Sequence, residues 1–160
     1  PLSKPAATTI GPDFITDFGL LAAACTMDVC SVEVTFSPVG TPGTQQAALL
    51  NQLADRGLGV HASLSWVDGI RLIVDASGVD AIEATLSDIG MEVMHVGEAS
   101  AMITYIGSWE DPEAWLHGLN AKNTEVVDHD VRRIRILVPR DHVKSTLEQT
   151  AKNAAWLAQA

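Results

Sequence analysis

The stretch from Ser31 to Ser65 constrains the fold of this chain more than any other. It opens with alternating apolar and polar residues through Val32–Phe36, the pattern of a half-buried strand. A turn rich in proline and glycine follows, and apolar residues then recur at helical spacing through Ala47–Ala54. Gly57 ends that helix, and Val60–Ser65 alternates again. Strand, helix and strand in this order predict the first half of a split βαβ unit.

The rest of the chain completes this unit and then repeats it in weaker form. We expect one βαββαβ unit over residues 31–96 and a second over residues 97–160. A further strand is expected over Ile15–Ala24, a turn over Thr26–Asp28, and a tail or linker over residues 1–14. The other expected elements are strands over Ile70–Asp75, Met91–Val96, Ala101–Ile106, Glu125–Asp128 and Arg133–Val138, and helices over Val79–Ile89, Glu113–Leu119 and His142–Trp156.

Charge and composition exclude several classes of partner. The 160 residues, 47% of them hydrophobic, suffice for one domain or two very small ones. Acidic residues outnumber basic ones by 20 to 10, which argues against nucleic acid and against an anionic membrane surface. No apolar run approaches the roughly 20 residues of a membrane span, and the N-terminus lacks a signal-peptide pattern. We therefore expect a cytoplasmic protein.

The turn between the first strand and helix is the best candidate binding site. Gly40, Thr41, Pro42, Gly43 and Thr44 lie at a helix N-terminus, where unpaired N–H groups and the helix dipole suit a carboxylate. The alternative is an ordinary strand-to-helix turn that binds nothing.

Two residues of the next strand are weaker candidates for the same site. His61 and Ser63 alternate with apolar residues, so they face either a ligand or partner sheet, or solvent.

No catalytic or metal-binding constellation is visible. Cys25 and Cys30 lack the spacing of a metal or redox pair, so we expect two small buried hydrophobes. The histidines are scattered, no cofactor motif is found, and Asp128-His129-Asp130 is typical of a hairpin turn. The four tryptophans indicate an interface, core packing at the boundary between the repeats, or a mixture of the two, and Trp109 is the best interface candidate because it falls in a predicted loop.

Two successive βαββαβ units of this size resemble tandem ACT domains, and more narrowly the C-terminal regulatory region of an aspartate kinase. Four motifs in the right order carry the resemblance over residues 15 to 156. In chain order they are the Pro-Gly effector loop SPVGTPGTQ, the helix, turn and strand LLNQLADRGLGVHASLS, the passage between repeats MEVMHVGEASAMITYIG, and the late strand and helix entry VRRIRILVPRDHV.

The resemblance implies an α+β fold of two interleaved ferredoxin-like units, with antiparallel sheets and helices on one face. The first unit would span 31–96, and 15–30 would join 97–160, the N-terminal strand completing the second sheet. A non-catalytic regulatory module is implied, which binds lysine, threonine or a related amino acid, pairs edge to edge as a homodimer, and controls a kinase domain or subunit. The alternative is an ACT-like structural or oligomerisation module without an effector. The implied effector-binding residues are Ser37, Val39, Gly40, Thr41, Pro42, Gly43, Thr44, Gln45, His61 and Ser63.

The effector loop departs from the family at one position. The family's loop commonly carries an aspartate before the Pro-Gly pair, but Val39 and Gly40 stand there in this chain. The α-ammonium group of an amino acid therefore needs an acid from elsewhere, or the site has lost its effector. The acids of the second repeat to consider first are Glu110, Asp111, Glu125 and Asp128.

Overall fold

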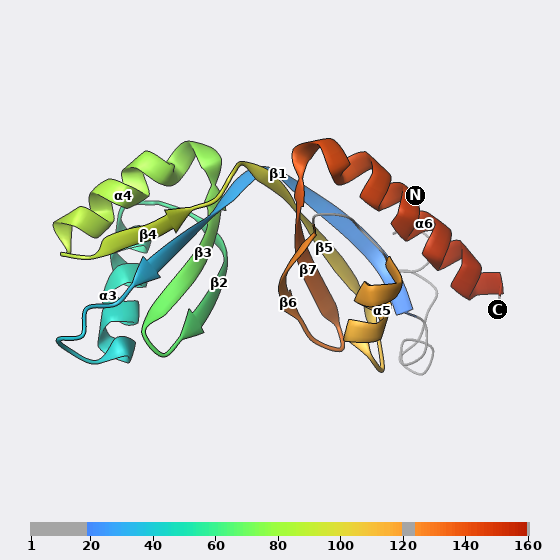
Figure 1. Ribbon diagram of the computed structural model, residues 1–160, viewed down its shortest axis with the longest axis horizontal. Helices are drawn as coiled ribbons and strands as arrows, with labels where there is room; N and C mark the ends of the chain where they lie inside the picture. The colour runs from blue at the N-terminus through green and yellow to red at the C-terminus, as the bar shows by residue number, and fades with distance from the viewer. Residues whose placement is uncertain (1–18, 120–123, 160) are drawn as a thin grey trace. The chain divides into compact units, whose positions relative to one another are not determined.

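The computed structural model describes residues 19–119 and 124–159 (Figure 1). The tail expected over residues 1–14 and the first part of the strand expected over Ile15–Ala24 lie outside the described residues. The chain divides into two compact units. The first unit is Asp28–Ala99, and the second combines Pro1–Met27, as far as it is described, with Ser100–Ala160.

The first unit is a ferredoxin-like βαββαβ fold. Its elements are β1 (Gly19–Thr35, shared with the second unit), α3 (Pro42–Asp55), β2 (Val60–Trp66), β3 (Gly69–Asp75), α4 (Val79–Asp88) and β4 (Glu92–Val96). The strands lie in the order β4, β1, β3, β2, and every neighbouring pair is antiparallel.

The second unit repeats this order of elements from the next strand onward. It contains β5 (Ser100–Ser108), α5 (Pro112–Leu119), β6 (Glu125–His129), β7 (Arg133–Pro139) and α6 (Val143–Gln159). Strand β5 pairs antiparallel with β7, and β7 with β6. On its other side β5 neighbours β1, which precedes it in the chain by a whole unit.

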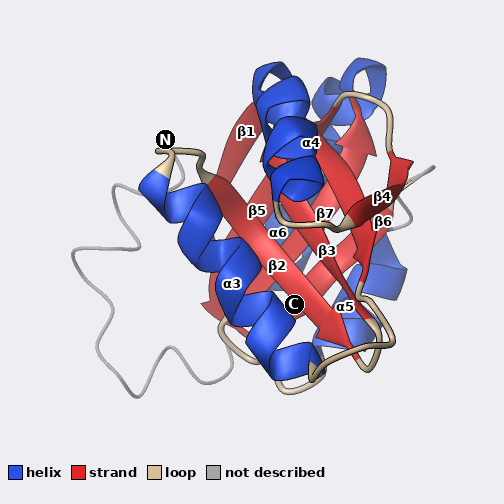
Figure 2. Cartoon of the chain, turned by 90° about the vertical axis from the view of Figure 1, so that its left-hand side faces the viewer, coloured by secondary structure: helices blue, strands red, loops and turns tan. Residues whose placement is uncertain are grey.

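Each sheet buries one face under its own helices. In the first unit, Val32 and Val34 of β1 pack with Leu49 of α3 and Ile82 of α4, so both helices cover the same face (Figure 2). In the second unit, alternate residues of β5 and β7 pack with residues of α5 and α6. Full burial of each such aliphatic side chain contributes roughly 1.5–3 kcal/mol. The structure thus confirms the expected α+β class, antiparallel sheets and helices on one face.

Glycines end both helices of the first unit. Gly57 (φ 69°) follows α3 and Gly90 (φ 74°) follows α4, in the left-handed region that glycine adopts most easily. After each glycine the chain closes the last turn: the Leu58 N–H donates to Leu53 O at 2.9 Å, and the Met91 N–H to Leu86 O at 2.9 Å. The glycine signals in the sequence therefore mark the true helix ends.

The turn expected over Thr26–Asp28 is wrong, because β1 continues through these residues without interruption. Asp28 does take a positive φ of 55°, which aspartate tolerates better than most residues. Strand pairing nevertheless resumes at once, since Val29 pairs with Asp75 of β3. The local turn signal was real, but it produces an irregularity inside a strand and not a reversal of the chain.

No helix in the described part of the chain is long and apolar enough to cross a membrane.

The early part of β1 should be required by the second unit. Leu20 and Ala23 pack against the core of that unit, beside strand β5. A chain lacking residues 1–24 loses these contacts and exposes an edge of β5, so we expect aggregation or a broadened unfolding transition. Thermal unfolding followed by tryptophan fluorescence measures this. A chain lacking only residues 1–14 is the control, and an unchanged midpoint and sharpness for the longer deletion would show that β1 is dispensable there.

Candidate functional site

A glutamine from helix α3 closes the loop between β1 and α3. The Ser37 N–H donates to Gln45 Oε1 at 2.7 Å, and Gln45 Nε2 donates to Ser37 O at 2.9 Å. One side chain thus satisfies both main-chain groups of the first loop residue. The loop is held in one shape although its residues from Ser37 to Thr44 are exposed.

Short hydrogen bonds order the inside of this loop. The Val39 N–H donates to Ser37 Oγ at 3.2 Å, a typical hydroxyl turn. Gly40 has φ 110°, a conformation that side-chain-bearing residues rarely adopt. A glycine is therefore required at this position for the loop to reach the start of α3.

The start of α3 is open to an anion. Thr41 occupies the N-cap position, but its hydroxyl bonds to Thr44 Oγ1 at 2.6 Å and makes no cap bond to the backbone. Pro42 has no N–H, and no acidic residue lies in the first turn. The N–H groups of Gly43 and Thr44 therefore gain no cap from Thr41, and they carry the partial positive charge of a helix N-terminus. This arrangement suits a carboxylate.

The turn between β2 and β3 adjoins the loop. The Phe36 N–H donates to Asp68 O at 2.7 Å, immediately before the loop begins. Asp68 is exposed, and it was not among the expected site residues. The sequence did carry a signal for it, since an Asp-Gly hairpin falls where the register of β1 against β3 ends, at Thr35 and Gly69.

His61 and Ser63 lie away from the loop. On β2, Val60 is level with Val74, whereas the end of β2 that adjoins the loop is Trp66, level with Gly69. His61 is thus about five residues, or roughly 16 Å, from the loop end of its strand. Its Nε2 is 2.7 Å from Asp75 Oδ1, so the imidazole engages a neighbouring strand. Ser63 is exposed.

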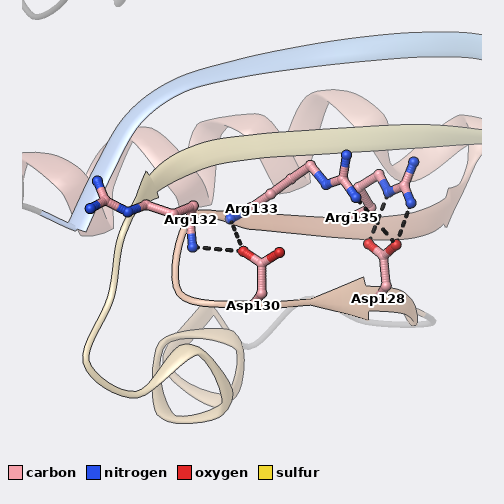
Figure 3. A network of polar contacts seen from close by, with 5 residues as sticks. All are labelled: Asp128, Asp130, Arg132, Arg133 and Arg135. Atoms are coloured by element: carbon pink, nitrogen blue, oxygen red, sulfur yellow. Dashed lines mark hydrogen bonds and ion pairs between the residues drawn. The ribbon is translucent and has the colours of Figure 1, made fainter.

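Two of the four acids considered as partners for an ammonium group are occupied within their own unit. Asp111 caps α5 by accepting a hydrogen bond from the Ala114 N–H at 3.0 Å. Asp128 accepts from Arg135 through both oxygens, one from Arg135 Nε at 2.8 Å, and Arg133 lies nearby (Figure 3). Glu110 and Glu125 are exposed.

The hairpin between β6 and β7 reverses later than the turn expected at Asp128-His129-Asp130, because Asp128 and His129 still belong to β6 and only Asp130 lies in the turn. Asp130 Oδ1 accepts hydrogen bonds from the N–H groups of Arg132 at 2.7 Å and Arg133 at 2.8 Å (Figure 3). These bonds hold the pKa of Asp130 below its usual range. The bidentate Asp128 pair raises the pKa of Arg135. The cluster is a turn and an ion pair, so its chemistry is structural.

Trp109 is buried in the core, so it is not the interface residue that was considered, and the alternative of core packing holds for it. It is 6% exposed and packs against Trp115 with ring centroids 5.2 Å apart, and Trp115 in turn meets Tyr105 edge-on at 4.9 Å. The ring belongs to the hydrophobic core of the second unit, where Trp115 and Leu119 of α5 also pack. The two indole N–H groups have no hydrogen-bond partner among the described residues.

The cysteines differ from each other in exposure. Cys30 is buried as expected, but Cys25 is exposed. Desolvation raises the pKa of both thiols, so neither is an activated nucleophile. In the described part of the chain no group of three or more His, Cys, Asp or Glu residues is placed to hold a metal ion.

The two units, with one strand supplied from ahead of the first, define the class of fold as a pair of interleaved ACT-type domains. No protein-family model and no curated protein matches the sequence. Solved structures do match, and they show that the fold is that of the regulatory region of aspartate kinases.

Three of these structures indicate how far the similarity reaches. The chain is similar to the regulatory subunit of aspartate kinase from Thermus flavus, with 16% identity and a TM-score of 0.65 over 84% of this chain and 97% of that one. A putative C-terminal regulatory domain of aspartate kinase from Porphyromonas gingivalis gives 16% identity and 0.69, over 82% and 94%. Aspartokinase III from E. coli, in complex with lysine and aspartate, gives 17% identity and 0.67, over 84% of this chain and 33% of that longer one.

Replacing Gln45 with alanine should loosen the loop without unfolding the unit. Both bonds to Ser37 are lost, but water reaches the exposed groups, so the free energy of unfolding should fall by only about 0.5–1.5 kcal/mol. The Ser37 amide should exchange its hydrogen markedly faster, as NMR or mass spectrometry measures. Gln46→Ala is the matched control, and equal exchange at Ser37 in both variants would contradict the closing role of Gln45.

Proposed function

We propose that this chain is an amino-acid-sensing regulatory module that acts on an aspartate kinase domain or subunit. The observation that carries the proposal is the loop Ser37–Gln45, a pre-ordered and exposed loop leading to an uncapped helix N-terminus. The fold shared with aspartate kinase regulatory structures supports it. One of those structures, the E. coli enzyme, was solved with lysine and aspartate bound. The proposed effector is lysine, threonine or a related amino acid.

In this proposal the loop binds the effector by its carboxylate. The first-turn N–H groups at Gly43 and Thr44 would donate to the two oxygens, and the dipole of α3 would add a favourable field. Because Gln45 has already ordered the loop, binding would not bear the full entropy of ordering it.

We assign the acid for the α-ammonium group to Asp68. Its turn is hydrogen-bonded to Phe36, the residue before the loop, and its side chain is exposed. Asp111 and Asp128 are engaged by their own unit and would have to give up those bonds first. Asp68 would thus take over the role of the aspartate that the loop itself lacks.

Calorimetry with lysine and threonine tests the proposal on the native chain and two variants. Gly43→Val should weaken binding at least tenfold by crowding the carboxylate position. It should leave the fold intact, because a Cβ at Gly43 meets no atom within 4 Å. Asp68→Asn should also weaken binding, through loss of the charged partner.

Gly59→Val is the matched control, since a Cβ there also meets nothing within 4 Å. Tight binding unchanged by Gly43→Val would rule out the loop as the site. If the native chain binds neither amino acid, the structural or oligomerisation module is the better account.

We also propose that the chain forms a homodimer through the edge of its first unit. Strand β2 pairs only with β3 among the described strands, which leaves its other edge open to a second copy. Light scattering at high micromolar concentration should give twice the 17.0 kDa mass of the chain. A strict monomer under these conditions would exclude the dimer.

A further inference from the structure

A cavity in the second unit has the features of a second binding site. It has a volume of about 390 Å³, within the range of small-molecule pockets, and it lies between helix α5 and strand β6. None of its lining residues belongs to the loop Ser37–Gln45, which lies in the first unit. A ligand here would therefore be distinct from the effector proposed above.

Helical spacing brings one wall of the cavity together. Leu116 and His117 of α5 stand three and four positions after Glu113, so the Cβ atom of each lies about 5–6 Å from that of Glu113 on the same side of the helix. This wall therefore presents a carboxylate, an aliphatic chain and an imidazole next to one another.

A β-bulge builds the opposite wall. Val126 pairs with Ile136, but the register then shifts, and His129 pairs with Ile134. Ile134 and Ile136 both belong to the core under the helices, so Val126 and His129 lie on the α5 side of β6 although they are three residues apart. In a regular strand Asp128, two residues after Val126, would lie on the α5 side. The bulge instead leaves Asp128 on the other face, with Arg135.

The cavity contains polar groups with capacity for a ligand. His129 Nε2 is 3.5 Å from Glu113 Oε1, longer than a good hydrogen bond, and the Glu113 side chain is 79% exposed. His117, on the same wall of the cavity, is exposed.

The apolar part of the lining is also incompletely covered. Leu119 is buried at 1% exposure, whereas Val126 on the edge strand is 43% exposed. Together with Leu116 these residues form an aliphatic surface beside the polar groups. A ligand with a short aliphatic chain next to its charges would cover the exposed valine.

We propose that this cavity binds an α-amino acid with a branched aliphatic side chain, of the valine, leucine and isoleucine class. The ammonium group of the ligand binds the Glu113 carboxylate, and the carboxylate of the ligand accepts a hydrogen bond from the His117 ring. The aliphatic chain packs on Leu116 and Val126. This site does not involve the loop of the first unit, so it can be tested independently of the proposed lysine or threonine site.

Calorimetry of the full chain with leucine and valine tests this site. We expect saturable binding, weakened at least tenfold by Glu113→Gln, which removes the charge but keeps the shape. Glu110→Gln is the matched control, because Glu110 is an exposed acid just before α5 that does not line the cavity. Isoamylamine and isovalerate, which each carry only one of the two charges of leucine, should bind at least tenfold more weakly than leucine.

Several outcomes would overturn this proposal. One is the absence of leucine binding to the native chain at millimolar concentration, and another is equally tight leucine binding after Glu113→Gln. Binding of isoamylamine as tight as that of leucine would refute the role given to the carboxylate. The Gly43→Val variant separates the two sites: it should leave leucine binding unchanged, and loss of leucine binding there would assign the ligand to the loop instead.

Discussion

The backbone hydrogen bonding of strand β1 is the constraint on which the structure depends. Its later part pairs with β3 on one side and β4 on the other, at the centre of the first sheet. Its earlier part neighbours β5 of the second unit. One strand therefore belongs to two hydrophobic cores, and Asp28, with its positive φ, lies at the junction between them. Neither unit contains a full set of four strands without this shared segment.

The two units share one topology, but they differ in the loop that leads from the first strand into the first helix. In the first unit, the passage from strand to helix is an exposed loop fixed by Gln45, with Thr41 at an N-cap position that makes no side-chain cap. In the second unit the equivalent passage is shorter, Asp111 caps the helix, and Trp109 fills the space beneath it. A capped and filled helix end has no room or charge for a carboxylate. The repeat therefore preserves the fold, while of these two equivalent loops only the one before α3 has the features of an anion site.

Much of the fold could be predicted from the sequence because it depends on local periodicity. The alternation at Val32–Phe36, the helical spacing at Ala47–Ala54 and the glycines after α3 and α4 are short-range signals, and the structure places elements there. The pairing register of the strands and the packing between distant elements could not be predicted in this way. The position of His61 depends on the pairing register of β2, and the burial of Trp109 depends on what lies beneath a short loop.

The order of the strands along the chain has a consequence for biosynthesis. The ribosome makes the first part of β1 early, but its neighbour β5 appears only after the whole of Asp28–Ala99 has been made. The first unit can close as its residues emerge, since its strands are contiguous in sequence. Meanwhile the early part of β1 carries unpaired N–H and C=O groups at an open edge. A neighbouring nascent chain on the same message offers an equivalent β5, so the exchange of this strand between two chains is the misassembly to which this architecture is most exposed.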